Sequence, residues 1–197
     1  MSQIHIAAIL GLSLTFYGLT ACHAQNDTSQ KAKQQPKQQS SSKIPQGYQL
    51  STIAQFNEPW AITSLKDGRL LITERKGKLQ LFDPQTRQKV EVKGLPKVAY
   101  GGQGGLGDIA LHPQFAQNHQ VYISYAAAGQ GGYRAVVARG ELDLSNAKNP
   151  QLKNLKTIWQ QVPKVQGQGH YGHRLLFGPD GKLWISSGER QKFDPAQ

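Results

Sequence analysis

The segment Trp60–Thr73 (WAITSLKDGRLLIT) decides the fold class, because two short apolar runs flank an Asp-Gly pair. Asp-Gly between such runs is a strong β-hairpin signal, since glycine adopts the left-handed backbone of a tight turn without steric cost. A second hairpin is predicted next, with strands at Leu70–Glu74 and Lys78–Phe82 joined through Lys76-Gly77. The segment therefore predicts consecutive antiparallel strands.

The same pattern occurs twice more along the chain. In Leu175–Ser186 (LLFGPDGKLWIS), a basic residue, leucine, an apolar residue, isoleucine and a hydroxyl residue follow Asp-Gly, as they do in Trp60–Thr73. A third copy with a longer loop comprises Asp108–Phe115 (DIALHPQF) and Val121–Tyr125 (VYISY). Such repeats, at intervals of several tens of residues, are typical of a β-propeller with four strands to a blade. The predicted fold is an all-β propeller, and a β-sandwich with coincidental hairpins is the alternative.

The length of the repeat region sets the number of blades. Residues 47–197 suffice for about three blades, at roughly 40–50 residues each. A propeller closes into a ring to remove its open strand edges, and such rings usually have more than three blades. Because Ser187–Gln197 shows no terminal strand pattern, we expect the chain to be the truncated N-terminal part of a longer propeller.

The N-terminal residues predict export and lipid anchoring. Ile6–Ala21 is uncharged and largely apolar, and at about 16 residues it is too short to span a bilayer. Residues 1–21 are therefore interpreted as a signal peptide. Leu19–Cys22 resembles the bacterial lipobox, in which the chain is cleaved before an acylated cysteine. A buried structural thiol is the alternative role of Cys22.

The next segment, residues 22–46, combines this cysteine with a run rich in Gln, Ser and Lys. It has almost no apolar residues to bury, so a disordered tether is predicted. Together these features predict a lipoprotein of the cell envelope, held in the membrane by lipid on Cys22. Since His23 is not aspartate, we expect the outer membrane, with the domain facing the periplasm.

The charge and the cysteine count exclude several classes of protein. The formal net charge is +11, but the basic residues are scattered near turns, without a basic helix or a basic cluster interleaved with aromatic residues. Nucleic acid is therefore not an expected partner, whereas anionic envelope surfaces are. Cys22 is the only cysteine, so no disulfide forms within the chain. His170 and His173 make no zinc site, because zinc needs three or four ligands.

The motif richest in chemical groups is Gly167–Leu175 (GQGHYGHRL), which places His170 in a glycine-rich loop before a predicted strand. Loops at the ends of strands commonly carry catalytic residues, and histidine titrates near neutral pH. A solvated loop histidine is the alternative interpretation. Gly101–Gly105 lacks the Lys-Ser/Thr pair of a phosphate-binding loop, and we expect it to let the backbone approach a ligand. The three tryptophans are expected to pack between blades: Trp60, Trp159 and Trp184.

Several separate motifs point to one family. The segment from about Gly47 to the C-terminus, which includes Pro179-Asp180-Gly181 and Gly188-Glu189, resembles the soluble PQQ-dependent aldose sugar dehydrogenases, the glucose/sorbosone dehydrogenase family. The motifs that carry this resemblance are, in chain order, Glu58–Ala61 (EPWA), Gly102–Asp108 (GQGGLGD), His112–Phe115 (HPQF) and Gly169–Leu175 (GHYGHRL).

The resemblance implies a six-bladed propeller with PQQ and calcium at one mouth. The implied reaction oxidises the anomeric hydroxyl of an aldose sugar to a lactone. His170 falls on the family's general base, Gln103 on the glutamine that hydrogen-bonds the sugar, and Arg174 on a residue expected to brace the loop. The electron acceptor is not implied by any residue.

Two departures from the family pattern matter. His173 stands where many members have glycine, and its ring would crowd the cofactor, point outward or have no effect. The family's main cofactor ligands lie on later blades, beyond this chain, so the isolated chain is expected to be inactive. The alternative function is a non-catalytic propeller lipoprotein of the envelope that binds carbohydrate or protein. A truncated relic that does not fold stably is the third.

Overall fold

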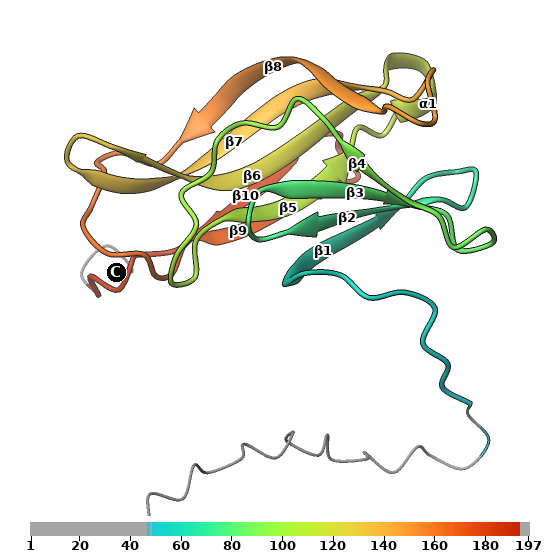
Figure 1. Cartoon of the computed structure of the whole chain (residues 1–197). Helices are drawn as coiled ribbons and strands as arrows, with labels where there is room; N and C mark the ends of the chain where they lie inside the picture. The colour runs from blue at the N-terminus through green and yellow to red at the C-terminus, as the bar shows by residue number, and fades with distance from the viewer. Residues whose placement is uncertain (1–46, 48, 194–197) are drawn as a thin grey trace, which may run out of the picture. The chain divides into compact units, whose positions relative to one another are not determined.

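The computed structural model describes residue 47 and residues 49–193 (Figure 1). The chain divides into two units, Met1–Tyr48 and Gln49–Gln197, and all the described helices and strands belong to the second. The predicted signal peptide (1–21), and Cys22 with the predicted tether (22–46), lie outside the described residues. Within the described part of the chain, no helix has the length and apolarity needed to cross a membrane.

The first sheet confirms the two hairpins predicted from Trp60–Phe82. Its four strands are antiparallel and pair in chain order. Gly68, in the predicted Asp-Gly turn, has a φ of 88°, the left-handed conformation that glycine tolerates. The strands are β1 (Pro59–Ser64), β2 (Leu70–Glu74), β3 (Lys78–Phe82) and β4 (Lys89–Val92).

The second sheet is larger and also pairs in chain order. Its first two strands are the third sequence copy, and the longer loop between them holds the one-turn helix α1 (Phe115–Asn118). His119 ends this helix in the left-handed conformation, at φ 52°. The strands are β5 (Leu106–Leu111), β6 (Gln120–Gly129), β7 (Gly132–Asp143) and β8 (Gln151–Gln160).

The third sheet contains two strands, β9 (Gly172–Phe177) and β10 (Leu183–Ser187), among the described residues. They form the antiparallel hairpin predicted at Asp180-Gly181, and Gly181 has a φ of 74°. The three sequence copies are thus the first two strands of three successive sheets. The described chain forms two four-stranded sheets and the first hairpin of a third.

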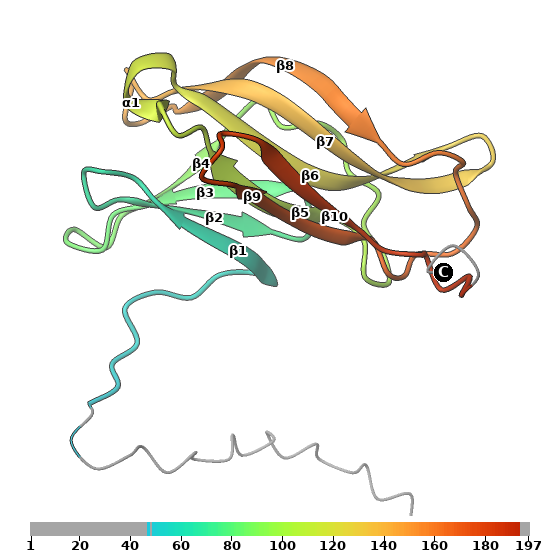
Figure 2. The same cartoon turned by 180° about the vertical axis from the view of Figure 1, so that it is seen from behind.

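The three sheets are arranged around their first strands. β1 lies against β5, and β5 lies against β9, so the first strands are neighbours although they are far apart in sequence (Figures 1 and 2). The later strands of the two larger sheets extend outward from this inner row. First strands lined up side by side, with each sheet radiating away from them, are the geometry of propeller blades.

The second sheet is buried on both faces, which follows from the alternation of side chains along a strand. On β6, Val121, Ile123 and Tyr125 face one way, and they pack with Leu71, Leu79 and Leu81 of the first sheet. Tyr122 points the other way and packs with Leu175, Phe177 and Ile185 of the third sheet. The hydrophobic core is therefore two layers, one on each face of the second sheet.

The three tryptophans differ in their surroundings. Trp159 packs against two of the buried clusters, and Trp60 lies half-buried. Trp184 is 64% exposed on the outer face of the third sheet, beside exposed Leu176. The prediction that Trp184 packs between blades stays a prediction, because no described strand covers that face.

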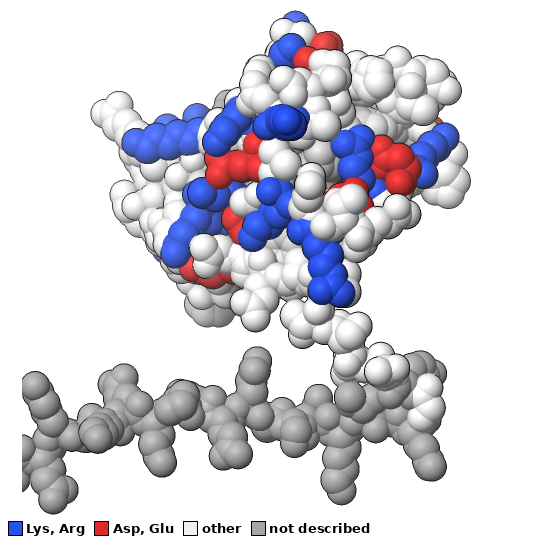
Figure 3. Space-filling view, turned by 45° about the vertical axis from the view of Figure 1, so that its right-hand side comes forward, with Lys and Arg blue, Asp and Glu red and all other residues white. Residues whose placement is uncertain are grey.

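Charges of both signs are mixed on the surface. On the face shown in Figure 3, lysine and arginine side chains lie next to aspartate and glutamate side chains. Described ion pairs join Lys78 and Lys93 to Glu91, at 2.9 and 2.7 Å, and Lys153 to Asp143 at 2.6 Å. This face therefore carries no continuous basic surface.

Candidate functional site

The inner strands of all three sheets bulge at the same point. Between matched pairs of residues, each first strand has one residue more than its partner strand. A bulge twists the strand locally and changes the direction of its side chains, and bulges are common beside active sites. The residues at the three bulges are Trp60 on β1, Gly107 and Asp108 on β5, and His173 and Arg174 on β9.

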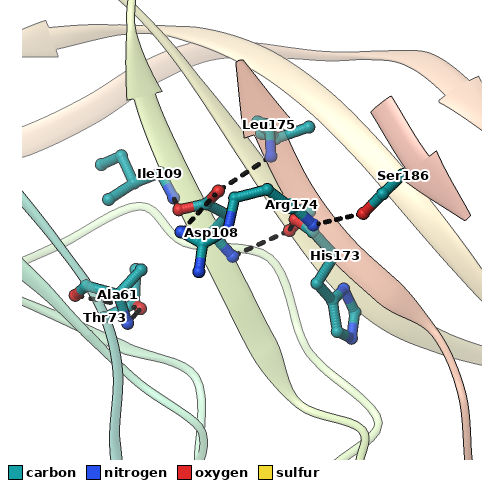
Figure 4. A network of polar contacts seen from close by, with 9 residues as sticks. Ala61, Thr73, Asp108, Ile109, His173, Arg174, Leu175 and Ser186 are labelled. Atoms are coloured by element: carbon teal, nitrogen blue, oxygen red, sulfur yellow. Dashed lines mark hydrogen bonds and ion pairs between the residues drawn. The ribbon is translucent and has the colours of Figure 1, made fainter. Parts of the chain in front are cut away.

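A side-chain hydroxyl from the second strand satisfies a backbone N–H at each bulge. These hydroxyls are the residues that follow isoleucine in the three sequence copies. The sequence repeat thus has a physical reason, because the bulge breaks the backbone ladder and the hydroxyl replaces the lost acceptor. The bonds run from Ala61 to Thr73 (2.9 Å) and from Arg174 to Ser186 (2.9 Å), both drawn in Figure 4, and from Asp108 to Ser124 (2.8 Å).

The residue just before each of these N–H groups occupies an equivalent position: Trp60, Gly107 and His173. The rings of Trp60 and His173 meet edge to face, with centroids 5.9 Å apart. A Cβ atom on Gly107 would lie 2.6 Å from Cγ of His173, so this position has no room for a side chain. Glycine on the middle strand therefore lets the two outer rings meet.

His170 lies in the loop before β9, and its side chain is 47% exposed. Its backbone is left-handed, at φ 42°, which is uncommon for a residue other than glycine. The N–H of His170 donates to Oε1 of Gln103 at 2.7 Å, and Nδ1 of its ring contacts Oε1 of Glu189. The structure thus brings together two predicted site residues, His170 and Gln103, and adds Glu189.

The contact with the His170 ring shifts the pKa of Glu189. The hydrogen bond from His170, followed by that from the N–H of Phe193, lowers the pKa of Glu189 from 4.5 to about 2. Glu189 is therefore a carboxylate at neutral pH and accepts hydrogen bonds only. Nδ1 of His170 is then the hydrogen-bond donor in this contact.

Gln103 is held at its place by both neighbouring loops. Its N–H donates to the carbonyl of Gln168 at 2.7 Å. Nη2 of Arg75 donates to the carbonyls of Gly102 and Gly104, on either side of it. The glycine-rich loop therefore makes its close backbone approach to Gln168, since a Cβ on Gly102 would lie 2.5 Å from the Gln168 carbonyl oxygen.

Arg190 fixes the loop in front of His170. Its side chain is fully buried, and its guanidinium stacks 3.7 Å from the centre of the Tyr171 ring. It donates to the carbonyls of Gly169 (2.7 Å) and Gly167 (2.6 Å). Burial lowers the pKa of Arg190, and within residues 49–193 no carboxylate pairs with it. Carbonyl oxygens thus satisfy this cation.

Arg174 and Asp108 connect the second and third sheets. Oδ2 of the buried Asp108 accepts the N–H of Leu175 at 2.8 Å and Nη1 of Arg174 at 3.3 Å (Figure 4). The Arg174 guanidinium also lies over the Trp60 ring, 5.0 Å from its centre. Arg174 therefore contacts residues of all three inner strands, and bracing of the loop stays its predicted role.

His173 faces a cavity of about 370 Å³ beside Gln103. Its side chain is 4% exposed, and neither ring nitrogen has a hydrogen-bond partner among the described residues. Burial, and then the positive charges of Arg190 and Arg75, lower the pKa of His173 from 6.5 to about 4. The side chains that line the cavity are Trp60, Arg75, Gln103, Tyr171 and His173. The ring is buried against Tyr171 and Trp60, so the outward orientation is wrong, and crowding of the cofactor stays a prediction.

These side chains fit the wall of a ligand site. The cavity has the size of many small-molecule sites, and the N–H groups of Arg75 and Gln103 fit a hydrogen-bonding ligand such as PQQ. Calcium prefers several oxygen ligands, usually with carboxylates among them. Residues 49–193 contain no group of three His, Cys, Asp or Glu side chains that could hold a metal ion, so they do not supply a calcium site built from carboxylates.

Comparison with known proteins identifies the family. A family model described as Glucose / Sorbosone dehydrogenase matches residues 56–197. The chain belongs to the glucose/sorbosone dehydrogenase family. It is 35% identical to the aldose sugar dehydrogenase YliI of Escherichia coli over 143 residues, which are 72% of this chain and 38% of that protein. It is also 29% identical to the human Hedgehog-interacting protein, over 70% of this chain and 21% of that protein.

A solved structure supports the same assignment. The PQQ-bound aldose sugar dehydrogenase from Streptomyces coelicolor matches with a TM-score of 0.60 and 33% identity, over 72% of this chain and 41% of that one. The predicted all-β propeller is thereby confirmed, and the described sheets are blades of a partial propeller. The chain spans about two fifths of the dehydrogenases that it matches.

Three residues of the site were given no role by the sequence. Glu189 belonged to a recognised motif, but its contact with His170 joins residues from the two ends of a hairpin. Asp108 also lay in a motif, and the hydroxyl at the end of each repeat was the signal for its bulge. Arg190 had no signal, because arginine in a loop is normally exposed.

Proposed function

We propose that this chain is part of a PQQ-dependent dehydrogenase that oxidises the anomeric hydroxyl of aldose sugars to lactones, with His170 as the general base. The observation that carries the proposal is the contact between Nδ1 of His170 and the carboxylate of Glu189. This contact orients the imidazole and leaves Nε2 available to accept a proton. Family membership and the PQQ-bound relative support PQQ as the cofactor.

The chain's own residues have separate tasks in this scheme. Nε2 of His170 takes the proton of the sugar hydroxyl, and the negative charge of Glu189 stabilises the resulting imidazolium. PQQ, when bound, would supply the acceptor for the hydride that leaves the carbon bearing this hydroxyl. Gln103 holds the His170 backbone through Oε1, and its Nε2 group, which donates no hydrogen bond to the described residues, is available to the sugar.

The test needs a complete ring, because the chain covers two fifths of its relatives' length. We suggest a chimera in which residues 47–197 replace the matching region of the Escherichia coli dehydrogenase. Sugar-dependent dye reduction after addition of PQQ and calcium is the expected result. His170→Ala should reduce it by a factor of about 10² to 10⁴, the usual contribution of a general base. His119→Ala, a histidine far from the site, is the matched control.

The dye-reduction result is interpreted only for a chimera that is shown to fold. A chimera that melts cooperatively and reduces no dye rejects the enzymatic proposal. Glu189→Gln sharpens the test, since glutamine keeps the size of Glu189 and removes its charge. We expect a decrease in kcat of about tenfold with a changed pH profile, because the imidazolium loses its partner. An unchanged pH profile would leave Glu189 with a structural role only.

A non-catalytic propeller that binds carbohydrate or protein is the second candidate. The similarity to the human Hedgehog-interacting protein favours it, because that name describes binding to another protein. Binding that is indifferent to PQQ and unchanged by His170→Ala would support this candidate. A propeller fold supports either catalysis or binding, so only the residues of the site distinguish the two functions.

We also propose that the protein is anchored to the cell envelope through lipid on Cys22, in the outer membrane facing the periplasm. The lipobox-like Leu19–Cys22 and the tether that follows it support this location. Metabolic labelling with a radioactive fatty acid should mark the wild-type protein and not Cys22→Ala. Labelling that survives Cys22→Ala would reject the anchor.

A further inference from the structure

Arg75 connects the first sheet to the loop that carries Gln103. It lies in the turn between β2 and β3, and its backbone is bonded in both directions. Its N–H donates to the carbonyl of Glu58 at 3.1 Å, and its carbonyl accepts the N–H of Leu106 at 2.9 Å. A Cβ on Gly105 would lie 2.1 Å from this carbonyl oxygen, so the turn and the loop are in close contact. The side chain of Arg75 therefore starts from a fixed backbone.

The Arg75 guanidinium contacts the backbone on both sides of Gln103. Nη2 donates to the carbonyl of Gly102, and it also donates to the carbonyl of Gly104 at 3.3 Å. A hydrogen bond from a charged donor is stronger than one from a neutral donor. Glycine has the most freedom to rotate, so these two positions depend on an outside contact to stay in place. One guanidinium thus fixes the two peptide groups that flank Gln103.

A carboxylate and a tyrosine orient this guanidinium. Oε2 of Glu58 accepts a hydrogen bond from Nη1 of Arg75 at 3.4 Å, and the Tyr100 hydroxyl lies 2.8 and 2.9 Å from the two oxygens of the same carboxylate. The Arg75 guanidinium also lies 5.5 Å from the centre of the Tyr100 ring. Glu58 has a φ of 48°, a strained conformation that persists where the surroundings impose it. The fold therefore maintains this carboxylate beside Arg75.

Gln103 transmits its placement to His170. The N–H of Gln103 donates to the carbonyl of Gln168 at 2.7 Å, and its Oε1 accepts the N–H of His170 at 2.7 Å. His170 has a left-handed backbone, at φ 42°, which needs such contacts to persist. The acceptor for its N–H thus lies on a loop that Arg75 fixes from the first sheet.

We propose that Arg75 is a positioning residue, which places Gln103 and the backbone of His170 for the reaction. The inference deepens the proposed function and rests on it, since Gln103 and His170 are the sugar contact and the base assigned there. Arg75 acts through these two residues. Without its guanidinium the loop loosens, so the sugar is bound less tightly and the base is less well aligned with the hydroxyl group.

Lys76 provides a matched control. Its Nζ lies 3.3 Å from Oε1 of Glu58 and 5.5 Å from the centre of the Tyr100 ring, so it shares two contacts with Arg75. The bonds to the two glycine carbonyls are made by Arg75, and Lys76 makes none to them within residues 49–193. Arg75→Gln and Lys76→Gln therefore remove the same charge beside Glu58, but they differ in whether the loop loses its bonds.

The first readout needs no activity. The full chain labelled with ¹⁵N-histidine gives backbone amide signals from six histidines, and His170→Ala assigns that of His170. In the absence of sugar and PQQ, Arg75→Gln should accelerate hydrogen exchange of the His170 N–H by about tenfold or more, because its acceptor is no longer fixed. The N–H groups of His112 and His119, bonded to other backbone carbonyls at 3.0 and 2.9 Å, should keep their rates. Lys76→Gln should leave all three unchanged.

The second readout is the kinetics of the chimera with the Escherichia coli dehydrogenase. Arg75→Gln should lower kcat/KM for the sugar by about 10- to 100-fold, with a higher KM, as expected for a misplaced binding group. Arg75→Lys keeps a charged donor without the forked guanidinium and should recover part of this loss. Lys76→Gln, which removes an exposed ion pair, should change kcat/KM by less than about twofold.

The inference is overturned if the His170 N–H exchanges at the wild-type rate in Arg75→Gln, even where activity is lost. It is also overturned if all three histidine amides accelerate together, because Arg75 would then serve overall stability, or if Lys76→Gln lowers kcat/KM equally. A folded chimera that reduces no dye rejects the proposed function. Faster exchange at His170 alone would then show that Arg75 couples the two loops without a catalytic purpose.

Discussion

In the second sheet the bulge of β5 is buried, whereas in the third sheet the corresponding bulge of β9 is partly exposed. Asp108 and Ser124 are both shielded from solvent, since other sheets cover both faces of the second sheet. Their counterparts Arg174 and Ser186 are exposed. The local geometry is the same, with N–H to hydroxyl distances of 2.8 and 2.9 Å.

The comparison shows that the sequence repeat determines the geometry of the bulge, whereas burial determines how much free energy its hydrogen bond contributes. An exposed N–H that loses its partner bonds to water, whereas a buried one cannot. The residue before the bulge N–H group, Gly107 in β5 and His173 in β9, also differs because its surroundings differ. Gly107 has no space for a Cβ because His173 lies against it, whereas His173 at the equivalent position borders a cavity. Three substitutions test this comparison.

Gly107→Ala should have the largest effect. The new methyl group would lie 2.6 Å from Cγ of His173, and Oγ of Ser124 is 2.8 Å away, so the inner strands must move apart. We expect the free energy of unfolding to decrease by about 3 kcal/mol, as for other overpacked sites. Denaturant unfolding monitored by fluorescence measures it.

A double-mutant cycle provides the control. If the collision with His173 is the cause, Gly107→Ala should cost less than about 1 kcal/mol in a His173→Gly background. Equal costs in both backgrounds would show that the ring of His173 is not what excludes a side chain from position 107.

The second prediction compares the two hydroxyls directly. Ser124→Ala should lower the free energy of unfolding by about 2 kcal/mol, because the Asp108 N–H and the His173 carbonyl both lose a buried partner. Ser186→Ala removes one exposed bond and should cost less than about 0.5 kcal/mol. Similar costs for the two variants, measured in the same denaturant titration, would contradict the role given to burial.

The third prediction concerns pH and depends on the buried ring of His173. Its pKa is about 4 in the folded chain, below the ordinary 6.5, so between these values the unfolded chain binds a proton that the folded chain does not. Stability is therefore highest above about pH 6.5 and decreases as the pH falls towards 4. From pH 7 to pH 5 this group should contribute a loss of somewhat less than about 2 kcal/mol.

The His173→Gly variant isolates this contribution. Other groups titrate in both proteins, so the quantity to compare is the change in unfolding free energy between pH 7 and pH 5. The wild-type chain should lose more than the variant over this interval. Parallel pH profiles would show that the ring is accessible to solvent in the folded state.

Much of the fold was predictable because the signals are local. The Asp-Gly turns at Asp67-Gly68 and Asp180-Gly181 act within a few residues, and both hairpins formed where they were predicted. The repeat of the terminal hydroxyl was also visible, although its purpose was not. The placement of β1, β5 and β9 as neighbours followed from the propeller fold, since no local pattern specifies which first strands lie side by side.

The site was predictable only in part. His170, Gln103 and Arg174 were named from motifs, and the structure joins the first two through a 2.7 Å hydrogen bond. Their roles stay predictions. Trp184 was expected to pack between blades, and it is exposed on a face that no described strand covers. Whether a tryptophan packs depends on a neighbouring sheet, which is not encoded beside it.

By itself, the sequence determined the strands, the turns, the family and the identity of the histidines, because turn preference and side-chain alternation depend on residues close together in the chain. Only the tertiary structure decided that His170 is exposed beside Glu189 while His173, three residues later, is buried with no hydrogen-bond partner in residues 49–193. Burial and charge depend on distant strands, here Gly107, Arg75 and Trp60. Two histidines in one short motif thus acquire different chemistry from their surroundings.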